Sequence, residues 1–116
     1  MSKRDYTLYL KDMLDACEAI LGFVKGKRKT ELKRNRMLRD ALIKNLETIG
    51  ECSKQVPLSI RRKHVEIEWK KIAGLRDILV HQYFKVDLDI LWDVIRRKVP
   101  ELRKKLNDIL GEERRS

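Results

Sequence analysis

Glycine, proline and aromatic residues are scarce in this chain. Its 116 residues include five glycines, two prolines and 6% aromatic residues, whereas charged residues make up 40%. Few residues therefore favour turns, and no run alternates between apolar and polar positions as a strand does. Leucine and the long charged residues are good helix formers. We expect residues 1–116 to form a single all-α domain, a bundle of about four to six helices.

Long apolar runs and paired cysteines are also missing. No run approaches the roughly 18 apolar residues that a membrane-spanning helix needs. The N-terminal sequence MSKRDYTLYLKD is too charged for a signal peptide. Cys17 and Cys52 show no C-x-x-C spacing, and each falls in an apolar helical pattern, which favours buried, reduced thiols. These features favour a cytoplasmic protein with no membrane association.

Motifs for metals and cofactors are absent. The only histidines, His64 and His81, form no cluster with cysteine, and the H-E-x-x-H, P-loop and G-x-S-x-G motifs do not occur. The Asp87–Asp89 pair lacks the strand and Gly-Ser loop of a nucleotidyltransferase, so helix capping explains it better. His64 follows three basic residues and is expected to be solvated. We therefore predict neither a metal site nor a cofactor.

Apolar residues repeat every three or four positions along most of the chain, which predicts helices. We expect helices over residues 5–24, 30–55 and 69–83, a fourth that Asp87 or Asp89 caps, and a last one with Pro100 in its first turn. Thr30 is the expected cap of the second helix. Pro57 begins a connector with at most a short helical turn. Asn45 lies near an apolar stripe and is expected to hydrogen-bond a neighbouring helix.

The net charge of the chain is +10, with an isoelectric point near 9.8. Such an excess attracts polyanions and favours nucleic acid or an acidic protein as a partner. A helical protein with many solvated Lys and Arg residues has the same composition, so charge alone leaves both interpretations open.

The segment LRDILVHQYF carries four polar residues on an otherwise apolar helix: Arg76, Asp77, His81 and Tyr83. Asp77 and His81 are four residues apart and share a face, so the carboxylate can hold one imidazole nitrogen. Arg76 and His81 lie about 140° apart around the helix, so they can cooperate either through the long arginine side chain or across a two-fold axis where two such helices meet. A buried ion pair that fixes helix packing is the structural alternative. It is costly unless each group is satisfied, which favours a wet, basic cleft.

These residues resemble the R-x-x-x-x-H-x-Y motif of the HEPN superfamily, with Asp77 as the polar residue after the arginine. The sequence is most similar to the HepT-like toxins of HepT/MntA toxin–antitoxin pairs, and the resemblance covers nearly the whole chain. The similar stretches, in order, are YLKDMLDACEAILGFVKGK, MLRDALIKNLETIGE, WKKIAGLRDILVHQYFKVDLDILWDVI and PELRKKL.

The resemblance implies a homodimeric HEPN domain that cleaves RNA without metal at a cleft shared by two motifs. It implies that Arg76 and His81 are catalytic, that Asp77 and Tyr83 support them, and that an MntA-like nucleotidyltransferase antitoxin can transfer AMP to Tyr83. The chemistry of the side chains agrees, since imidazole suits proton transfer and guanidinium binds phosphate. The alternative is a non-catalytic helical module that binds nucleotide, RNA or its nucleotidyltransferase partner.

Overall fold

The computed structural model describes the backbone of residues 3–81 and 87–115 and the side chains of residues 6–75 and 87–114. Within these ranges every regular element is helical, which confirms the all-α prediction. The order is α1 (Lys3–Val24), α2 (Thr30–Arg34), α3 (Arg36–Gln55), α4 (Leu58–Lys63), α5 (Trp69–His81), α6 (Leu88–Asp93), the π-helical segment η2 (Val94–Lys98) and α7 (Val99–Arg115).

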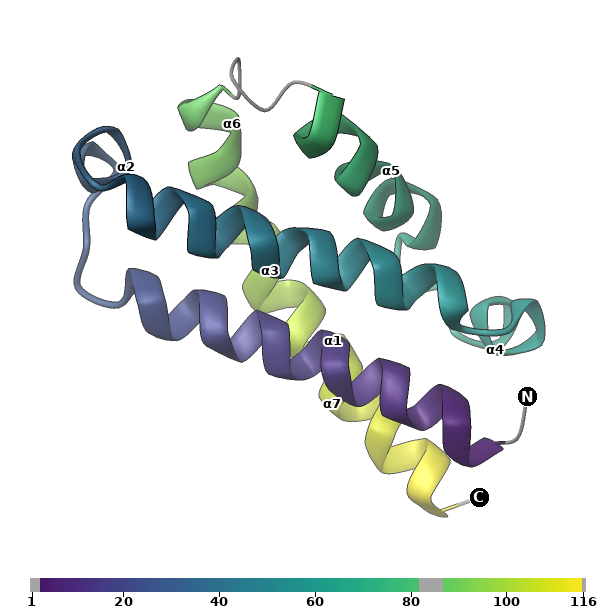
Figure 1. Ribbon diagram of the computed structural model, residues 1–116. Helices are drawn as coiled ribbons and strands as arrows, with labels where there is room; N and C mark the ends of the chain where they lie inside the picture. The colour runs from purple at the N-terminus through teal and green to yellow at the C-terminus, as the bar shows by residue number, and fades with distance from the viewer. Residues whose placement is uncertain (1–2, 82–86, 116) are drawn as a thin grey trace.

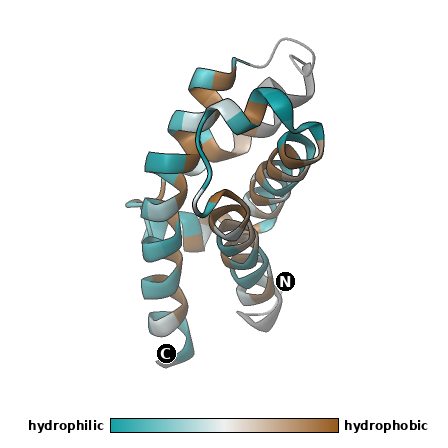
Figure 2. Cartoon of the chain, turned by 90° about the vertical axis from the view of Figure 1, so that its left-hand side faces the viewer, coloured by the Kyte–Doolittle hydropathy of each residue, from teal (hydrophilic) through white to brown (hydrophobic). Residues whose placement is uncertain are grey.

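The long helix α3 lies at the centre of the bundle, with α1 along one side and α5 along another (Figure 1). Helix α7 packs against α1, so the two ends of the described chain lie at the same end of the molecule. Apolar positions form stripes along the helices rather than blocks (Figure 2). These stripes meet in one core, whose most deeply buried members include Leu10, Met13, Ile20, Leu42, Leu46, Ile49, Ile95, Leu106 and Ile109.

The expected helix over residues 30–55 is two helices, and Thr30 does not cap the longer one. Asn35 adopts an extended conformation between α2 and α3, and its Oδ1 accepts a hydrogen bond of 3.0 Å from the backbone N–H of Leu38. Asparagine is favoured at the N-cap and disfavoured inside a helix, because at the N-cap its side chain accepts a hydrogen bond from a free N–H of the first turn. The guanidinium of Arg39 donates to the carbonyls of Leu32 and Lys33, which fastens α2 to α3.

The last two expected helices are continuous. Asp87 caps α6 by accepting hydrogen bonds from the N–H groups of Asp89 and Ile90. It is one of the two caps that the sequence predicted for this helix. The helical backbone then continues through η2 into α7, and the N–H of Val99 donates to the carbonyl of Val94. Proline lacks an N–H and clashes with the carbonyl four residues before it. The wider π-turn immediately before Pro100 accommodates the proline without ending the helix.

Two smaller expectations have different outcomes. Asn45 does not reach a neighbouring helix, because its Nδ2 donates to the carbonyl of Ala41 in the same helix at 2.9 Å. The connector after Pro57 does contain a short helix, α4, as expected.

Candidate functional site

The helix that carries the arginine–histidine motif is fastened to the core at its N-terminal end. Trp69 begins α5, is only 9% exposed, and donates a 2.8 Å hydrogen bond from Nε1 to the carbonyl of His64. Ile72 and Leu75 lie one and two turns further on and pack against the core on the α3 side. The first half of α5 therefore has a fixed orientation about its own axis, and this orientation extends along the helix to the motif.

Arg76, Asp77 and His81 all lie within α5, as the sequence predicts, and His81 is its last residue. Their side chains, and Tyr83 as a whole, lie outside the part of the chain that the structure describes. The helical backbone still defines the face on which each position lies. Relative to Ala73, position 76 is about 60° to one side, and positions 77 and 81 are about 40° and 80° to the other. The motif positions therefore share the half of α5 that is centred on Ala73, and Ile72 and Leu75 lie towards the other half.

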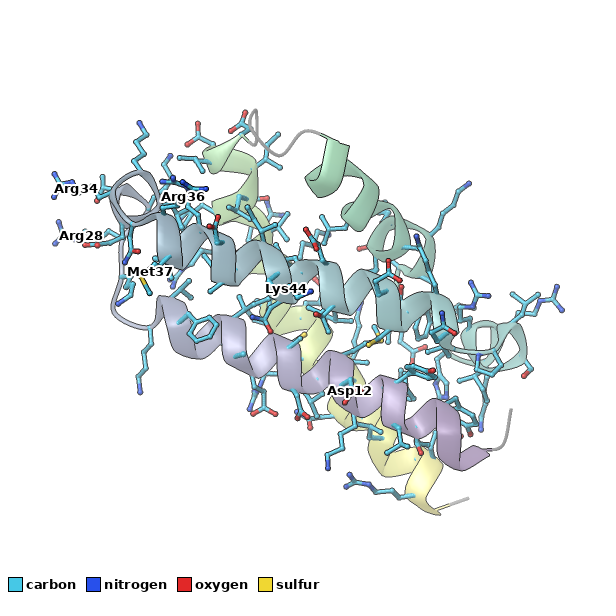
Figure 3. The ribbon with its side chains drawn as sticks, in the orientation of Figure 1. Asp12, Arg28, Arg34, Arg36, Met37 and Lys44 are labelled. Carbon is cyan, nitrogen blue, oxygen red and sulfur yellow. The ribbon has the colours of Figure 1, made fainter. Side chains whose placement is uncertain are left out.

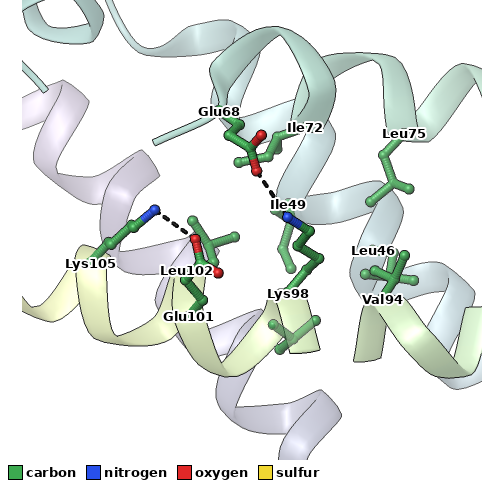
Figure 4. A pocket seen from close by; sticks show the side chains of 11 residues that line it. Leu46, Ile49, Glu68, Ile72, Leu75, Val94, Lys98, Glu101, Leu102 and Lys105 are labelled. Atoms are coloured by element: carbon green, nitrogen blue, oxygen red, sulfur yellow. Dashed lines mark hydrogen bonds and ion pairs between the residues drawn. The ribbon is translucent and has the colours of Figure 1, made fainter. Parts of the chain in front are cut away.

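The core-facing side of α5 borders a narrow apolar groove (Figure 4). Its volume is about 70 Å³, and Leu46 and Ile49 of α3 are among the residues that line it. Charged residues on its rim are paired with one another. Lys105 lies 2.7 Å from Glu101, and Glu68 lies 2.9 Å from Lys71 and 3.4 Å from Lys98. A groove this small, with a paired rim, is a feature of packing rather than a binding site.

The other side of α5 borders a larger, open hollow between α4 and α5. Its volume is about 470 Å³, and Trp69, Lys70 and Ala73 line it from α5. Arg61 and Arg62, both in the last turn of α4, line it from the other side. This hollow is on the half of α5 that carries the motif positions. We name it the α4–α5 hollow.

His64 is buried, not solvated as expected, and it belongs to a polar cluster that joins the two ends of the chain. Only 2% of His64 and 3% of Glu113 are exposed. Glu113 Oε2 lies 3.1 Å from His64 Nε2 and 3.0 Å from Lys63 Nζ, and Glu113 Oε1 accepts a hydrogen bond from the Tyr6 hydroxyl. The sequence carries no local signal for this cluster, because Glu113 lies 49 residues after His64 and 107 after Tyr6.

Two members of this cluster have strongly shifted pKa values. The hydrogen bond from Tyr6, with those from His64 and Lys63, holds the pKa of the Glu113 carboxyl at about 2 although its burial opposes this. Burial and the nearby Glu113 carboxylate raise the pKa of Tyr6 to about 12. The cluster therefore contains a carboxylate and a neutral phenol at neutral pH. It lies at the α1–α4–α7 end of the molecule, where it ties the chain ends together.

Both cysteines are free thiols, as expected: Cys17 is buried and Cys52 is half-buried. Burial raises the pKa of Cys17 to about 12 and also raises the pKa of Cys52, so both are unreactive at neutral pH. Over residues 6–75 and 87–114, no three His, Cys, Asp or Glu side chains come together in a way that could hold a metal ion. None of the helices in the described part is long and apolar enough to cross a membrane.

Basic residues concentrate at the end of the molecule where α2 lies. Arg28, Arg34 and Arg36 lie there near Met37, whereas Lys44 of α3 and Asp12 of α1 lie further along the molecule (Figure 3). Of these basic residues, Arg36 is paired with Asp40 at 3.5 Å, and nearby Lys29 is paired with Asp89 of α6. The α2 end is therefore one of the places where the positive charge that the composition indicates is concentrated, and α4 carries another group of basic residues, Arg61, Arg62 and Lys63.

An all-α bundle with an R-x-x-x-x-H motif on a core-anchored helix has the features of a HEPN-type protein. A model of the family described as "Ribonuclease HepT-like" matches residues 13–109. The chain therefore belongs to the HepT-like ribonuclease family. This confirms the resemblance noted in the sequence and places the protein among ribonucleases.

Several curated relatives match almost end to end. A protein named "Putative RNase" from Caldanaerobacter subterraneus subsp. tengcongensis is 40% identical, over 91% of this chain and 95% of the relative. A second protein of that name, from Methanocaldococcus jannaschii, is 38% identical over 91% and 97% of the two chains. A "Probable ribonuclease HepT" from Thermococcus cleftensis is 36% identical over 92% and 97%. No solved structure gives a significant match.

Proposed function

We propose that this chain, as one HepT-like domain over residues 1–116, is a metal-independent endoribonuclease. The observation that carries the proposal is the R-x-x-x-x-H motif on α5, a helix anchored at Trp69, in a member of the HepT-like ribonuclease family. The names of the relatives point to RNA as the substrate. The basic charge of the chain suits a polyanionic substrate.

The proposed reaction needs no group beyond these side chains and the RNA. The 2′-oxygen of a ribose attacks the adjacent phosphorus, and its proton passes to the neutral imidazole of His81. The bond between phosphorus and the 5′-oxygen breaks, and a protonated imidazole donates a proton to that oxygen. Arg76 binds the non-bridging oxygens as negative charge grows on them. The products are a 2′,3′-cyclic phosphate and a 5′-hydroxyl, so DNA, which lacks the 2′-hydroxyl, is not cleaved.

The angular spacing on α5 supports a homodimer as the active form. Positions 76 and 81 lie about 140° apart around one helix, so one chain presents them in different directions. A two-fold axis beside α5 would place the arginine of one protomer next to the histidine of its partner. Asp77, four residues before His81, is the group proposed to orient the imidazole.

We further propose that the enzyme is a cytoplasmic toxin neutralised by an MntA-like nucleotidyltransferase. In the proposed modification, the Tyr83 hydroxyl oxygen attacks the α-phosphorus of ATP, pyrophosphate leaves, and the proton passes to solvent. The added AMP brings one negative charge, which pairs with Arg76 and occupies the place of an RNA phosphate.

The decisive experiment is RNA cleavage by the purified protein, with analysis of the new ends. We expect 2′,3′-cyclic phosphates, unchanged activity in EDTA, and loss of cleavage in His81→Ala and Arg76→Ala variants that keep their helical circular dichroism. Cleavage by a folded His81→Ala variant at the wild-type rate would remove the catalytic assignment. RNA or nucleotide binding without cleavage by the wild-type protein would support the non-catalytic module instead.

The modification has its own test. Incubation with an MntA-like nucleotidyltransferase, ATP and Mg²⁺ should add mass in AMP units to Tyr83. The Tyr83→Phe variant should stay unmodified. An equal gain of mass by the phenylalanine variant would place the modification elsewhere.

A further inference from the structure

Three cationic side chains line the α4–α5 hollow without an acidic partner among the side chains that the structure describes. Arg61, Arg62 and Lys70 form no ion pair there, although other described lysines and arginines form eight. Neighbouring lysines on the same two helices are paired, Lys63 with Glu113 and Lys71 with Glu68. Among the described basic residues of α4 and α5, the unpaired ones are therefore those that line the hollow, whereas exposed basic residues on other helices, such as Lys44 and Lys104, are unpaired as well.

One of the residues that line the hollow also has a buried hydrogen-bond donor without a partner among the described residues. The Nε of Arg61 is buried and has no hydrogen-bond partner in the described part of the chain. A buried donor without a partner costs free energy, and an anion bound by the same guanidinium would offset part of that cost. For a guanidinium, the acceptors that fit best are the oxygens of a phosphate or a carboxylate.

Apolar side chains complete the hollow and leave room for a planar group. Leu58 and Val65 line it and are 49% and 77% exposed, so the hollow presents apolar surface to solvent. Ala73 contributes only a methyl group at the centre of the motif-bearing half of α5. The hollow is open to solvent, and its volume of about 470 Å³ leaves room for a nucleotide to lie on it. The combination of apolar surface and unpaired cations suits a nucleotide, whose base is largely apolar on its faces and whose phosphate is anionic.

The hollow is continuous with the motif along α5. Ala73 lies three residues before position 76 and four before position 77, and residues at these spacings are neighbours on one helix face. The rise from Ala73 to position 76 is about 4.5 Å, and to position 81 about 12 Å. A strand of RNA with its scissile phosphate at the motif would thus pass directly over the hollow.

We propose that the α4–α5 hollow is a subsite for a nucleotide of the RNA substrate next to the scissile phosphate. Arg61, Arg62 and Lys70 bind its phosphate, and Leu58 and Val65 contact its base. The subsite rests on the proposed ribonuclease function. A subunit interface centred on the hollow itself would oppose like charges from both protomers, so we place the hollow at the edge of the proposed dimer interface, where it stays open to RNA.

The test measures RNA affinity separately from cleavage. In the His81→Ala background, which prevents turnover, Arg62→Gln with Lys70→Gln should weaken binding of single-stranded RNA at least about tenfold at low salt. Each lost phosphate contact should also reduce the slope of log Kd against log salt by about 0.7, so about 1.4 for the pair. The matched control is Lys104→Gln with Arg114→Gln, which removes the same charge from exposed positions of α7.

A second pair of variants tests the base contact. Val65→Ser should weaken binding of RNA but not of an abasic ribose-phosphate strand. Met37→Ser, which alters a residue 84% exposed at the far end of α3, should change neither. Wild-type affinity and slope in the charge variant, or equal losses in the α7 control, would overturn the subsite. A changed oligomeric state with unchanged RNA affinity would instead make the hollow a subunit interface.

These outcomes separate the subsite from the ribonuclease proposal. If the wild-type protein does not cleave RNA, the catalytic proposal fails, whereas the loss of affinity in the Arg62 and Lys70 variant still measures the subsite. If the wild-type protein cleaves and the variant binds and cleaves normally, only the subsite fails.

Discussion

The two sides of α5 border hollows of opposite character. Towards the core, the groove beside Leu46 has a volume of about 70 Å³, and the charges on its rim are paired. Towards α4, the hollow is open, about 470 Å³ in volume, and its three cations are unpaired. Both sides have charged side chains, so charge alone does not distinguish them. The two sides differ in whether these charges have partners. The charges on the rim of the narrow groove are paired with one another, whereas the unpaired cations of the hollow, and the buried Nε of Arg61 that lacks an acceptor, favour binding of an anion.

The largest expected effect is on the motif-bearing side, at Arg76. Lysine keeps the positive charge but cannot bind two phosphate oxygens in the fixed geometry of guanidinium. Arg76→Lys should therefore lower kcat by about 10²–10³-fold, as the loss of a donor to transition-state charge does, with Tm unchanged. Steady-state cleavage and a thermal melt on the same samples measure both. A fall in Tm that matches the fall in activity would make Arg76 a packing residue.

On the core-facing side we expect an effect of similar size in kcal/mol, but on the free energy of unfolding rather than on catalysis. Leu46 is 1% exposed and lines the narrow groove. Leu46→Ala removes buried apolar contacts and enlarges an existing gap, which costs about 2–5 kcal/mol of unfolding free energy. Urea unfolding measures the loss, and cleavage per folded molecule at low temperature should be preserved. If this variant folds stably but does not cleave, the two sides of α5 are not functionally separate.

The buried cluster at the chain ends should give stability a dependence on acid pH. The pKa of Glu113 is about 2 in the folded chain and near 4.5 when it is unperturbed. The carboxylate therefore stabilises the fold above pH 4.5, and this contribution disappears as the pH falls from about 4.5 to 2. Glu113→Gln should cost about 1–3 kcal/mol at pH 7 and flatten the acid limb of stability against pH. An unchanged acid limb in this variant would show that other carboxylates determine it.

The same cluster predicts an alkaline effect of opposite sign. The pKa of Tyr6 is raised from 10.0 to about 12, so the neutral phenol stabilises the fold below pH 10 and this contribution is lost between pH 10 and 12. Tyr6→Phe should remove that part of the pH dependence. Urea unfolding between pH 10 and 12 measures this loss of stability. Tyr9→Phe is the control variant, because Tyr9 is not in the cluster.

The smallest expected effect is at the rim of the narrow groove. Glu101 and Lys105 pair on the exposed surface of α7, four residues apart. Exposed pairs of this kind contribute little, because water screens them and both side chains lose freedom. Glu101→Gln should leave Tm within about 2 °C of wild type and leave RNA cleavage unchanged. A larger loss of activity would mean that this side also contacts the substrate.

Local sequence signals identified most helices and their ends. The apolar spacing of three and four predicted the stretches that became α1, α3, α5 and α7, because that spacing buries one face of a helix. Asp87 caps α6 as expected. The misplaced helix start at Thr30 has a local cause too, since Asn35 is an equally good cap and lies directly before the longer apolar stripe.

The sequence by itself determined the all-α class, the positions of Arg76, Asp77 and His81 on one helix, and the HepT-like family. Each of these depends on spacing within a short stretch of chain. Only the tertiary structure decided that His64 is buried against Glu113, that the cations beside α5 are paired on one side and unpaired on the other, and that the unpaired ones face the motif-bearing half. The reason is that partners from α1, α4 and α7 are up to 107 residues apart, and the bundle brings them together only when the whole core packs.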